Sequence, residues 1–482
     1  MRLAIIHYHL RKGGVTRVIS SALEALGDQV EASVVLSSTE SEEALPCSVG
    51  VIPPLAYDDQ ATTEKADALY QAVRETARQH LGGDPDVWHI HNHSLGKNAC
   101  FPEVLRRLID DGARVLLQIH DFAEDGRPGN YKTRQKPYED GTFSDADKAL
   151  YPVAPQIGYA VLNGRDLAIL KSAGIPESNL FWLPNAVSIP DFSDEEMKRE
   201  RHPDEVPLIL YPTRAIRRKN VGELLLLAAT NPGYRFATTL SPKNPQWTPI
   251  HDDWAALAKE LNLPVEFALG EQAGHTYASL ISEAHAMVST SVGEGFGLAF
   301  LEPWLLGKPV TGRDLPEVTG DFKENGIHLP DLYPEWQIPC SLFDVTGFKE
   351  RFIQCLNAIY TAYGRSLKSD LLEDVWNELI SNDTVDFSCL DETAQAEAIR
   401  AVCASNESLV TSPVNMDALD QSVISSNSQR IRENYGLDHY GKSLAEIYQT
   451  LGQAKPAKAG SVNADLVLNA FLDPSRLRML RS

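Results

Sequence analysis

The most informative stretch of this chain is residues 293–310, which read GEGFGLAFLEPWLLGKPV. Glu294 and Glu302 stand eight residues apart, and a glycine-rich bend at 295–297 lies between them, ahead of apolar residues typical of a helix start. A glycine loop that opens a helix leaves backbone N–H groups unpaired, and such groups bind anions. Carboxylates accept hydrogen bonds from sugar hydroxyls. The segment therefore predicts a nucleotide-sugar pocket, with phosphate on the backbone and hydroxyls on the glutamates.

Four cations follow a predicted strand at residues 208–211: Arg214, Arg217, Arg218 and Lys219. Arginine grips phosphate oxygens with two N–H groups and lysine acts as a point charge, so cations at the carboxyl end of a parallel strand suit a diphosphate. The alternative is a solvated basic loop.

Two pairs of residues in the first half also lie where a ligand would approach. Gly13 and Gly14 separate the first predicted strand from the first helix, although they complete neither a dinucleotide fingerprint nor a P-loop. His120 and Asp121 end a predicted strand at 115–120 and suit contact with sugar hydroxyls or proton handling. A tight turn without a ligand and a structural histidine are the respective alternatives.

A basic segment follows at residues 126–136, where the glycines and a proline predict a loop. It contains cations and no acidic residue, and three cations near the first turn would add to it: Arg127, Lys132, Arg134, Lys136, with Arg11, Lys12 and Arg17. The segment is either a solvated surface or a binding site for an acceptor that carries phosphate or carboxylate.

The sequence predicts no metal site and no resident cofactor. His89, His91 and His93 alternate and would share one face of a strand, but no carboxylate or cysteine stands at ligand spacing. The two Asp-x-Asp sequences, at 84–86 and 145–147, are predicted as a turn and a helix start rather than a metal clamp.

The elements that position these residues alternate between short apolar runs and helical patterns, which predicts parallel sheets wrapped by helices. We expect one α/β domain at 1–188, a polar linker at 189–206 and a second α/β domain at 207–344. A mostly helical extension follows at 345–454, with an irregular insert at 406–428, and a C-terminal helical segment at 455–482. Ligands bind at the carboxyl ends of such sheets, and we expect them in a cleft between the domains.

Bulk composition narrows the class of protein. The 482 residues include 43% hydrophobic and 23% charged residues, as in globular proteins, and no apolar run is long enough to span a membrane. The formal net charge of −22 argues against nucleic acid as a partner. The six cysteines are scattered without a CxxC motif, which fits a reducing cytoplasm.

With these residues in hand, the chain resembles the retaining glycosyltransferases of family four, which have the GT-B fold of two Rossmann-like domains facing across a cleft. The specific part is the E-x7-E element at Glu294 and Glu302, preceded by Arg214-x4-Lys219. Thr213 and Ala186 depart mildly from the family's usual residues, and the family suggests no role for 345–428.

The resemblance implies transfer of a hexose from a UDP-, GDP- or ADP-sugar to a hydroxyl acceptor, without metal. It implies the following roles: His120 near the sugar, Arg214 and Lys219 on the diphosphate, Glu294 on the sugar, Phe296, Gly297 and Leu298 beside sugar and phosphate, and Glu302 on the ribose. Gly13 and Gly14 would line the acceptor and phosphate region, to which we add Asp121, Arg127 and Lys132. The alternatives are a sugar-nucleotide epimerase of the same architecture and a non-catalytic sugar-nucleotide sensor.

Overall fold

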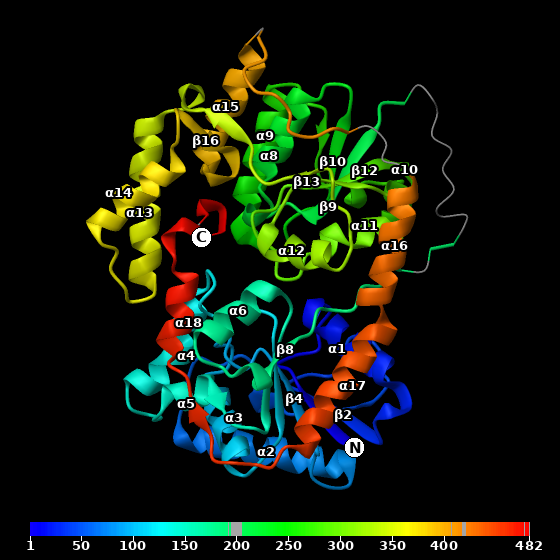
Figure 1. Cartoon of the computed structure of the whole chain (residues 1–482), viewed down its shortest axis with the longest axis vertical. Coiled ribbons are helices and arrows are strands. Elements are labelled where there is room, and N and C mark those ends of the chain that lie inside the picture. The colour runs from blue at the N-terminus through cyan, green and yellow to red at the C-terminus, as the bar shows by residue number, and fades with distance from the viewer. Residues whose placement is uncertain (191, 194–204, 406, 417–420, 477, 482) are drawn as a thin grey trace. The chain divides into compact units, whose positions relative to one another are not determined.

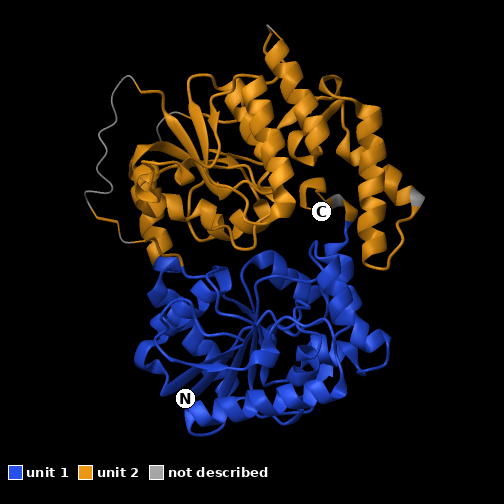
Figure 2. Ribbon diagram, turned by 180° about the vertical axis from the view of Figure 1, so that it is seen from behind, with its two compact units in different colours: residues 1–186, 433–473 blue, residues 187–432, 474–482 orange. Residues whose placement is uncertain are grey.

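The computed structural model describes residues 1–190, 192–193, 205–405, 407–416, 421–476 and 478–481. They form two compact units, coloured separately in Figure 2. Unit 1 comprises Met1–Ala186 and Glu433–Asp473, and unit 2 comprises Val187–Arg432 and Pro474–Ser482. Most of the predicted linker, residues 191 and 194–204, lies outside the described residues, as do residues 406 and 417–420 of the predicted insert.

Unit 1 is built on a seven-stranded parallel sheet in the order β3-β2-β1-β4-β5-β7-β8. The strands are β1 (Arg2–Ile6), β2 (Ala32–Ser37), β3 (Ser48–Val51), β4 (Val87–His91), β5 (Val115–Ile119), β7 (Ile157–Val161) and β8 (Leu180–Trp182). The helices are α1 (Gly14–Leu26), α2 (Thr63–Leu81), α3 (Phe101–Asp110), α4 (Pro128–Glu139), α5 (Ala146–Leu150), α6 (Gly164–Ser172), α17 (Leu437–Gln453) and α18 (Ala464–Phe471). A short antiparallel pair joins β6 (Pro152–Val153) to β17 (Gly460–Ser461).

Both faces of the central strands are buried, which explains why these strands are mostly apolar. Successive residues of a strand point to opposite faces. Leu3 and Ile5 of β1 belong to a core shared with α1 and α17, whereas Ala4 and Ile6 belong to one shared with α2 and α3. Figure 1 shows α1 and α17 side by side over the sheet.

Unit 2 is built on a six-stranded parallel sheet in the order β11-β10-β9-β12-β13-β14. The strands are β9 (Leu208–Arg214), β10 (Arg235–Leu240), β11 (Val265–Glu266), β12 (Ala284–Ser289), β13 (Val310–Arg313) and β14 (Leu332–Tyr333). The helices are α8 (Val221–Thr230), α9 (Thr248–Glu260), α10 (Tyr277–Glu283), α11 (Glu302–Leu305), α12 (Pro316–Glu324), α13 (Val345–Ala362), α14 (Ser369–Leu379), α15 (Glu392–Ala404) and α16 (Gln421–Tyr435), the last of which continues into unit 1.

The strand order of each sheet reverses once, between β1 and β4 in unit 1 and between β9 and β12 in unit 2. At such a reversal the loops after the two central strands diverge, and the crevice between them is where open α/β sheets bind ligands. These two strand ends are therefore the places to look for a site in each unit.

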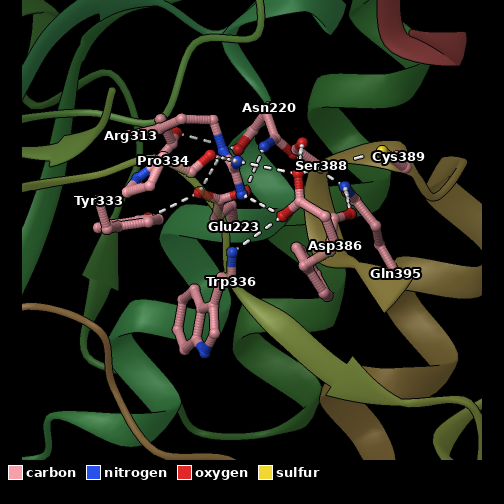
Figure 3. Close-up of polar contacts among 12 residues, drawn as sticks. Asn220, Glu223, Arg313, Tyr333, Pro334, Trp336, Asp386, Ser388, Cys389 and Gln395 are labelled. Atoms are coloured by element: carbon pink, nitrogen blue, oxygen red, sulfur yellow. Dashed lines mark hydrogen bonds and ion pairs between the residues drawn. The ribbon is translucent and has the colours of Figure 1, made fainter. Parts of the chain in front are cut away.

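A buried ionic network ties the helices after residue 344 to the sheet of unit 2 (Figure 3). Arg313 of β13 lies between two carboxylates, with Nη2 2.8 Å from Glu223 Oε2 of α8 and 2.8 Å from Asp386 Oδ1 of β16 (Thr384–Asp386). Tyr333 donates to Glu223 Oε1 at 2.6 Å. Strand β16 pairs antiparallel with β15 (Gln337–Pro339), so the network and the strand pair together fix α14 and α15 to this unit.

The mostly helical region expected at 345–454 is divided between the two units. Helix α13 packs its apolar side, including Phe348 and Phe352, into the core of unit 2. Helix α17 instead packs Tyr440 and Leu444 into unit 1, where it covers a sheet face that would otherwise be exposed. The insert predicted as irregular at 406–428 contains the start of α16.

Candidate functional site

In unit 2, Lys219, Arg218 and Glu294 converge where the sheet order reverses. The two cations belong to the short helix η4 (Arg217–Lys219), which follows β9, and Glu294 follows the neighbouring strand β12. The Lys219 ammonium contacts the Glu294 carboxylate, and Arg218 Nη1 lies 3.0 Å from Glu294 Oε2. Arg218 also donates to the carbonyl of Gly293 at 2.6 Å. Two cations from the loop after β9 therefore contact a single carboxylate from the loop after β12.

The electrostatics of this group favour bound anions. The side chains of Glu294 and Lys219 are 11% and 12% exposed, and that of Arg218 is 42% exposed. Burial alone would raise the pKa of Glu294, but the charges of Lys219 and Arg218 outweigh it and lower that pKa to about 2. Glu294 is a carboxylate at neutral pH, so it accepts hydrogen bonds and cannot donate a proton.

The loop that carries Lys219 is held from behind by the network of Figure 3. Asn220 adopts a left-handed conformation (φ 49) and donates to Glu223 Oε2 at 2.7 Å, while Gln395 donates to Asn220 Oδ1 at 2.8 Å. Thr290 Oγ1 donates to the carbonyls of Lys219 and Asn220. The conformation of the loop therefore depends on residues of α8, α15 and β12.

The other two predicted cations have different partners. Arg214 Nη1 donates to the carbonyl of Ser241 at 3.1 Å, at the end of β10. Arg217 forms a two-point ion pair with Glu392 of α15, at 2.5 and 3.0 Å. Arg217 thus anchors the helical region. The cation that lies beside Lys219 on Glu294 is Arg218, whereas the resemblance assigned the diphosphate to Arg214 and Lys219.

The glycine-rich bend is tighter than the predicted helix start. Gly297 has φ 93 and precedes a 3-10 turn over Leu298–Phe300, and α11, which begins at Glu302, contains only four residues. Phe296 is buried with its ring centroid 5.7 Å from that of Phe322. A helix this short carries little macrodipole, so a ligand here would bind to the N–H groups of the bend itself.

In unit 1, His120 and Asp121 are held at the carboxyl end of β5. Their backbone N–H groups donate to Asn92 Oδ1 at 2.8 and 3.2 Å. His120 Nε2 lies 2.8 Å from His91 Nδ1, with the two rings stacked. Asp121 accepts from Arg127 Nη2 at 2.5 Å.

The histidines around His120 are buried and uncharged at neutral pH. Burial lowers the pKa of His7 and His89 to about 3 and that of His93 and His120 to about 4. It also lowers the pKa of His91 well below the ordinary value. His89 bonds Tyr448 and Gln118, and His93 bonds the carbonyl of Leu150. The predicted histidine row is therefore a hydrogen-bonded part of the sheet. No group of three potential metal ligands was found among the described residues.

The basic segment at 126–136 is not a loop, which corrects the sequence expectation. Arg127 precedes α4, because Pro128 occupies the first helical turn, where its missing N–H costs nothing. Arg134 is fully buried in an ion pair with Glu124 at 2.9 Å and cannot meet a ligand. Lys132 is exposed on α4. Gly13 precedes α1 and Gly14 is its first residue, and both are exposed.

This chain resembles a known protein along its whole length. No family model matches the sequence. The chain is 27% identical to mannosylglucosyl-3-phosphoglycerate synthase from Petrotoga mobilis, in an alignment of 521 residues that covers 100% of this chain and 99% of the relative.

Solved structures share the fold at low sequence identity. Anabaena HepE, in complex with UDP-glucose, has a TM-score of 0.54 at 12% identity and covers 93% of this chain and 100% of its own. The catalytic domain of starch synthase IV from Arabidopsis thaliana, bound to ADP and acarbose, has a TM-score of 0.53 at 11% identity and covers 94% and 99%. Sucrose-phosphate synthase from Thermosynechococcus elongatus has a TM-score of 0.51 at 16% identity and covers 93% and 98%. The chain therefore has the GT-B fold, built from two Rossmann-like units, as these glycosyltransferases do.

Proposed function

We propose that this chain is a retaining glycosyltransferase that moves a hexose from a nucleotide-diphosphate sugar to a hydroxyl of an acceptor. The observation that carries the proposal is the convergence of Lys219 and Arg218 on Glu294 at the sheet reversal of unit 2. Among the described helices, none has the length and apolarity needed to cross a bilayer. The proposal is supported by the Petrotoga relative, which aligns over 100% of this chain and is named mannosylglucosyl-3-phosphoglycerate synthase.

The chemistry assigns one task to each charged group. When the bond between the anomeric carbon and the diphosphate breaks, negative charge develops on the departing phosphate oxygen. Lys219, Arg218 and the N–H groups of the bend at 295–297 would stabilise that charge as it forms. The acceptor oxygen forms the new bond on the same face, and its proton passes to the departing phosphate. Glu294 would hold the sugar hydroxyls.

His120 would act as a neutral hydrogen-bonding group. Its pKa of about 4 leaves it uncharged at neutral pH, so it adds no charge that would oppose the developing cationic character of the sugar. Its Nε2 is engaged by His91, which leaves Nδ1 as the atom for a sugar hydroxyl. This arrangement orients a substrate and does not require His120 to transfer a proton.

The first experiment is a donor screen. UDP-, GDP- and ADP-sugars of glucose and mannose are tested by thermal shift, where a donor at 100 times its Kd stabilises by about 2.7 kcal/mol. Because the relative is named for mannosyl, glucosyl and 3-phosphoglycerate groups, glucosyl-3-phosphoglycerate and 3-phosphoglycerate lead the acceptor panel. Products are identified by mass spectrometry, and the anomeric configuration by NMR.

Lys219→Ala tests the mechanism, with Lys259→Ala, an exposed lysine of α9, as the matched control. Loss of one charge-stabilising donor lowers turnover by about 10²–10³-fold. Turnover of Lys219→Ala within threefold of wild type, in a folded protein, would exclude Lys219 from the reaction. Donor conversion without any acceptor would identify an epimerase, and donor binding without turnover would identify a sensor.

A further inference from the structure

A second charged group lies in unit 1, where its sheet order reverses between β1 and β4. His9 and Arg11 follow β1, and Lys97 follows β4. Tyr57 comes from the loop after β3 and lies between them, with its hydroxyl 2.9 Å from His9 Nε2 and its ring centroid 5.0 Å from Lys97 Nζ. None of these residues takes part in the sugar-transfer chemistry described above.

Backbone contacts fix this group in place. The loop that carries Lys97 pairs with the loop that carries Tyr57, since the Asp58 N–H donates to the carbonyl of Lys97 at 3.0 Å. Asn98 fastens the same two loops by donating to the carbonyls of Pro54 and Ala56 at 2.9 and 2.8 Å. Lys97 and Tyr57 are therefore held by the strands' own loops and do not depend on a bound molecule for their positions.

Positive charge predominates here and is not neutralised. Lys97 is partly buried, and no carboxylate of the described residues lies within ion-pair distance of it. Burial and the nearby charge of Arg127 lower the pKa of Lys97, against a smaller opposing effect of Asp121, which is bound to Arg127. Burial and the charges of Arg11 and Lys97 lower the pKa of His9, with Glu42 opposing. Glu42 accepts from the backbone of Lys12.

A partly buried cation without a counter-ion costs folding free energy, and groups of this kind concentrate at functional sites. The lysine sits at the crevice where this fold binds ligands. Tyr57 is 52% exposed, so an aromatic ring and a hydroxyl border the cations at the surface. His9 Nδ1 is buried without a partner in the described residues.

We propose that Lys97 and Arg11 bind an oxyanion group of the acceptor, a phosphate or a carboxylate, with Arg127 adding positive charge and the Tyr57 ring bordering the sugar or carbon chain attached to it. Arg127 itself bonds Asp121 and the carbonyls of Phe122 and Asp125, so its charge rather than its N–H groups serves the ligand. This inference rests on the proposed transferase function and names the part of the acceptor that the enzyme selects.

The test measures binding of three matched probes to the full chain by calorimetry: glycerol 3-phosphate, glycerate and glycerol. The three share a carbon skeleton and carry a phosphate, a carboxylate or neither, so they separate the two sources of the anion. Lys97→Met removes the charge with little change in length, and Lys97→Arg keeps it. Lys442→Met, which changes an exposed lysine of α17, is the control. Lys219→Ala shows whether the probe binds to unit 2 instead.

We expect Lys97→Met to raise the Kd of an anionic probe by about tenfold or more, because a charge-assisted hydrogen bond is lost. Lys97→Arg, Lys442→Met and Lys219→Ala stay within about threefold of wild type. Because Lys97 has no counter-ion, the melting temperature of Lys97→Met is equal to or above that of wild type. Glycerol binds none of the proteins measurably.

Three results would overturn the inference: an unchanged Kd for Lys97→Met, an equal loss in Lys442→Met, or loss of probe binding in Lys219→Ala. The donor screen on the same proteins separates this inference from the proposed function. If anion binding depends on Lys97 while no nucleotide sugar binds, the anion site stands and the transferase proposal fails. If donors bind and turn over while Lys97→Met keeps its affinity for anions and acceptor, the transferase stands and the anion site fails.

Discussion

Mild acid should unfold unit 1 because its buried histidines are held neutral. His7 and His89 have a pKa of about 3, and His93 and His120 a pKa of about 4, compared with an ordinary value of 6.5. At a pH between the folded and the unfolded pKa values, the unfolded chain binds protons at these histidines and the folded chain does not, so the free energy of unfolding rises with pH in this range. The stability is fully present above pH 6.5 and is lost as the pH falls toward 4.

The size of this effect follows from the pKa difference. At pH 5.0 an unfolded histidine is almost fully protonated, so each neutral buried histidine costs about 2 kcal/mol relative to pH 7.5. For the four histidines together the loss is about 8 kcal/mol, which is comparable to the whole stability of a typical domain at 5–15 kcal/mol. The ion pair between Lys219 and Glu294 is still intact at this pH, since the pKa of Glu294 is about 2.

The assay is hydrogen exchange of peptides from residues 87–120, corrected for the intrinsic pH dependence, at pH 7.5 and 5.0. His89→Gln removes one of the buried rings, which bonds Tyr448 and Gln118. We expect the variant to be less stable than wild type at pH 7.5 by about 1–3 kcal/mol. We also expect it to lose about 2 kcal/mol less than wild type on going to pH 5.0.

His80→Gln is the matched control, because His80 is exposed at the end of α2. Its loss of protection between the two pH values should equal that of wild type. If His89→Gln loses as much protection as wild type between the two pH values, His89 is not kept neutral by burial. The same argument would then fail for the other histidines.

Three further predictions concern unit 2. Glu294→Gln removes the carboxylate that pairs with Lys219 and Arg218, so calorimetry should show nucleoside diphosphates binding at least as tightly as to wild type. The kcat for transfer should fall about 10- to 100-fold, because the contact of Glu294 with the sugar is lost. Weaker diphosphate binding would contradict this. Arg313→Met leaves Glu223 and Asp386 buried without a cation, and urea titrations should show a free energy of unfolding of unit 2 lower by about 3–5 kcal/mol. The control Lys243→Met changes an exposed lysine and should alter this free energy little. A loss below about 1 kcal/mol in Arg313→Met would show that the network is not needed. Gly297→Ala places a Cβ 2.7 Å from Val318 Cγ1 at φ 93 and should destabilise by more than about 1 kcal/mol, unlike Gly233→Ala, whose Cβ meets nothing within 4 Å; equal melting temperatures would refute the strain.

Much of the secondary structure follows from local pattern. The strand expected at 115–120 is β5, which ends one residue earlier, and the strand expected at 208–211 is the first part of β9. Strand β3, Ser48–Val51, was missed because it is a short edge strand with only one buried residue. Helix α4 was missed because glycine and proline suggest a loop, although proline is well tolerated in a first helical turn.

The sequence does not indicate to which unit each helix after residue 344 belongs. Amphipathic stripes identify α13 and α17 as helices that bury one side, but they do not say which sheet each covers. The structure distributes them between the two units, and it ties α15 to the loop that carries Lys219 through Gln395 and Asn220. A hydrogen bond between residues 175 positions apart has no local signature.

The sequence by itself determined two parallel sheets with cations and carboxylates at their strand ends, because periodicity and strand-end polarity are local properties. Only the tertiary structure decided that Arg218 joins Lys219 on Glu294, that Arg134 is buried in an ion pair, and that Lys97 has none. Ion pairing depends on which loops a sheet brings together, and Lys219 and Glu294 meet across 75 positions of chain because β9 and β12 are neighbours.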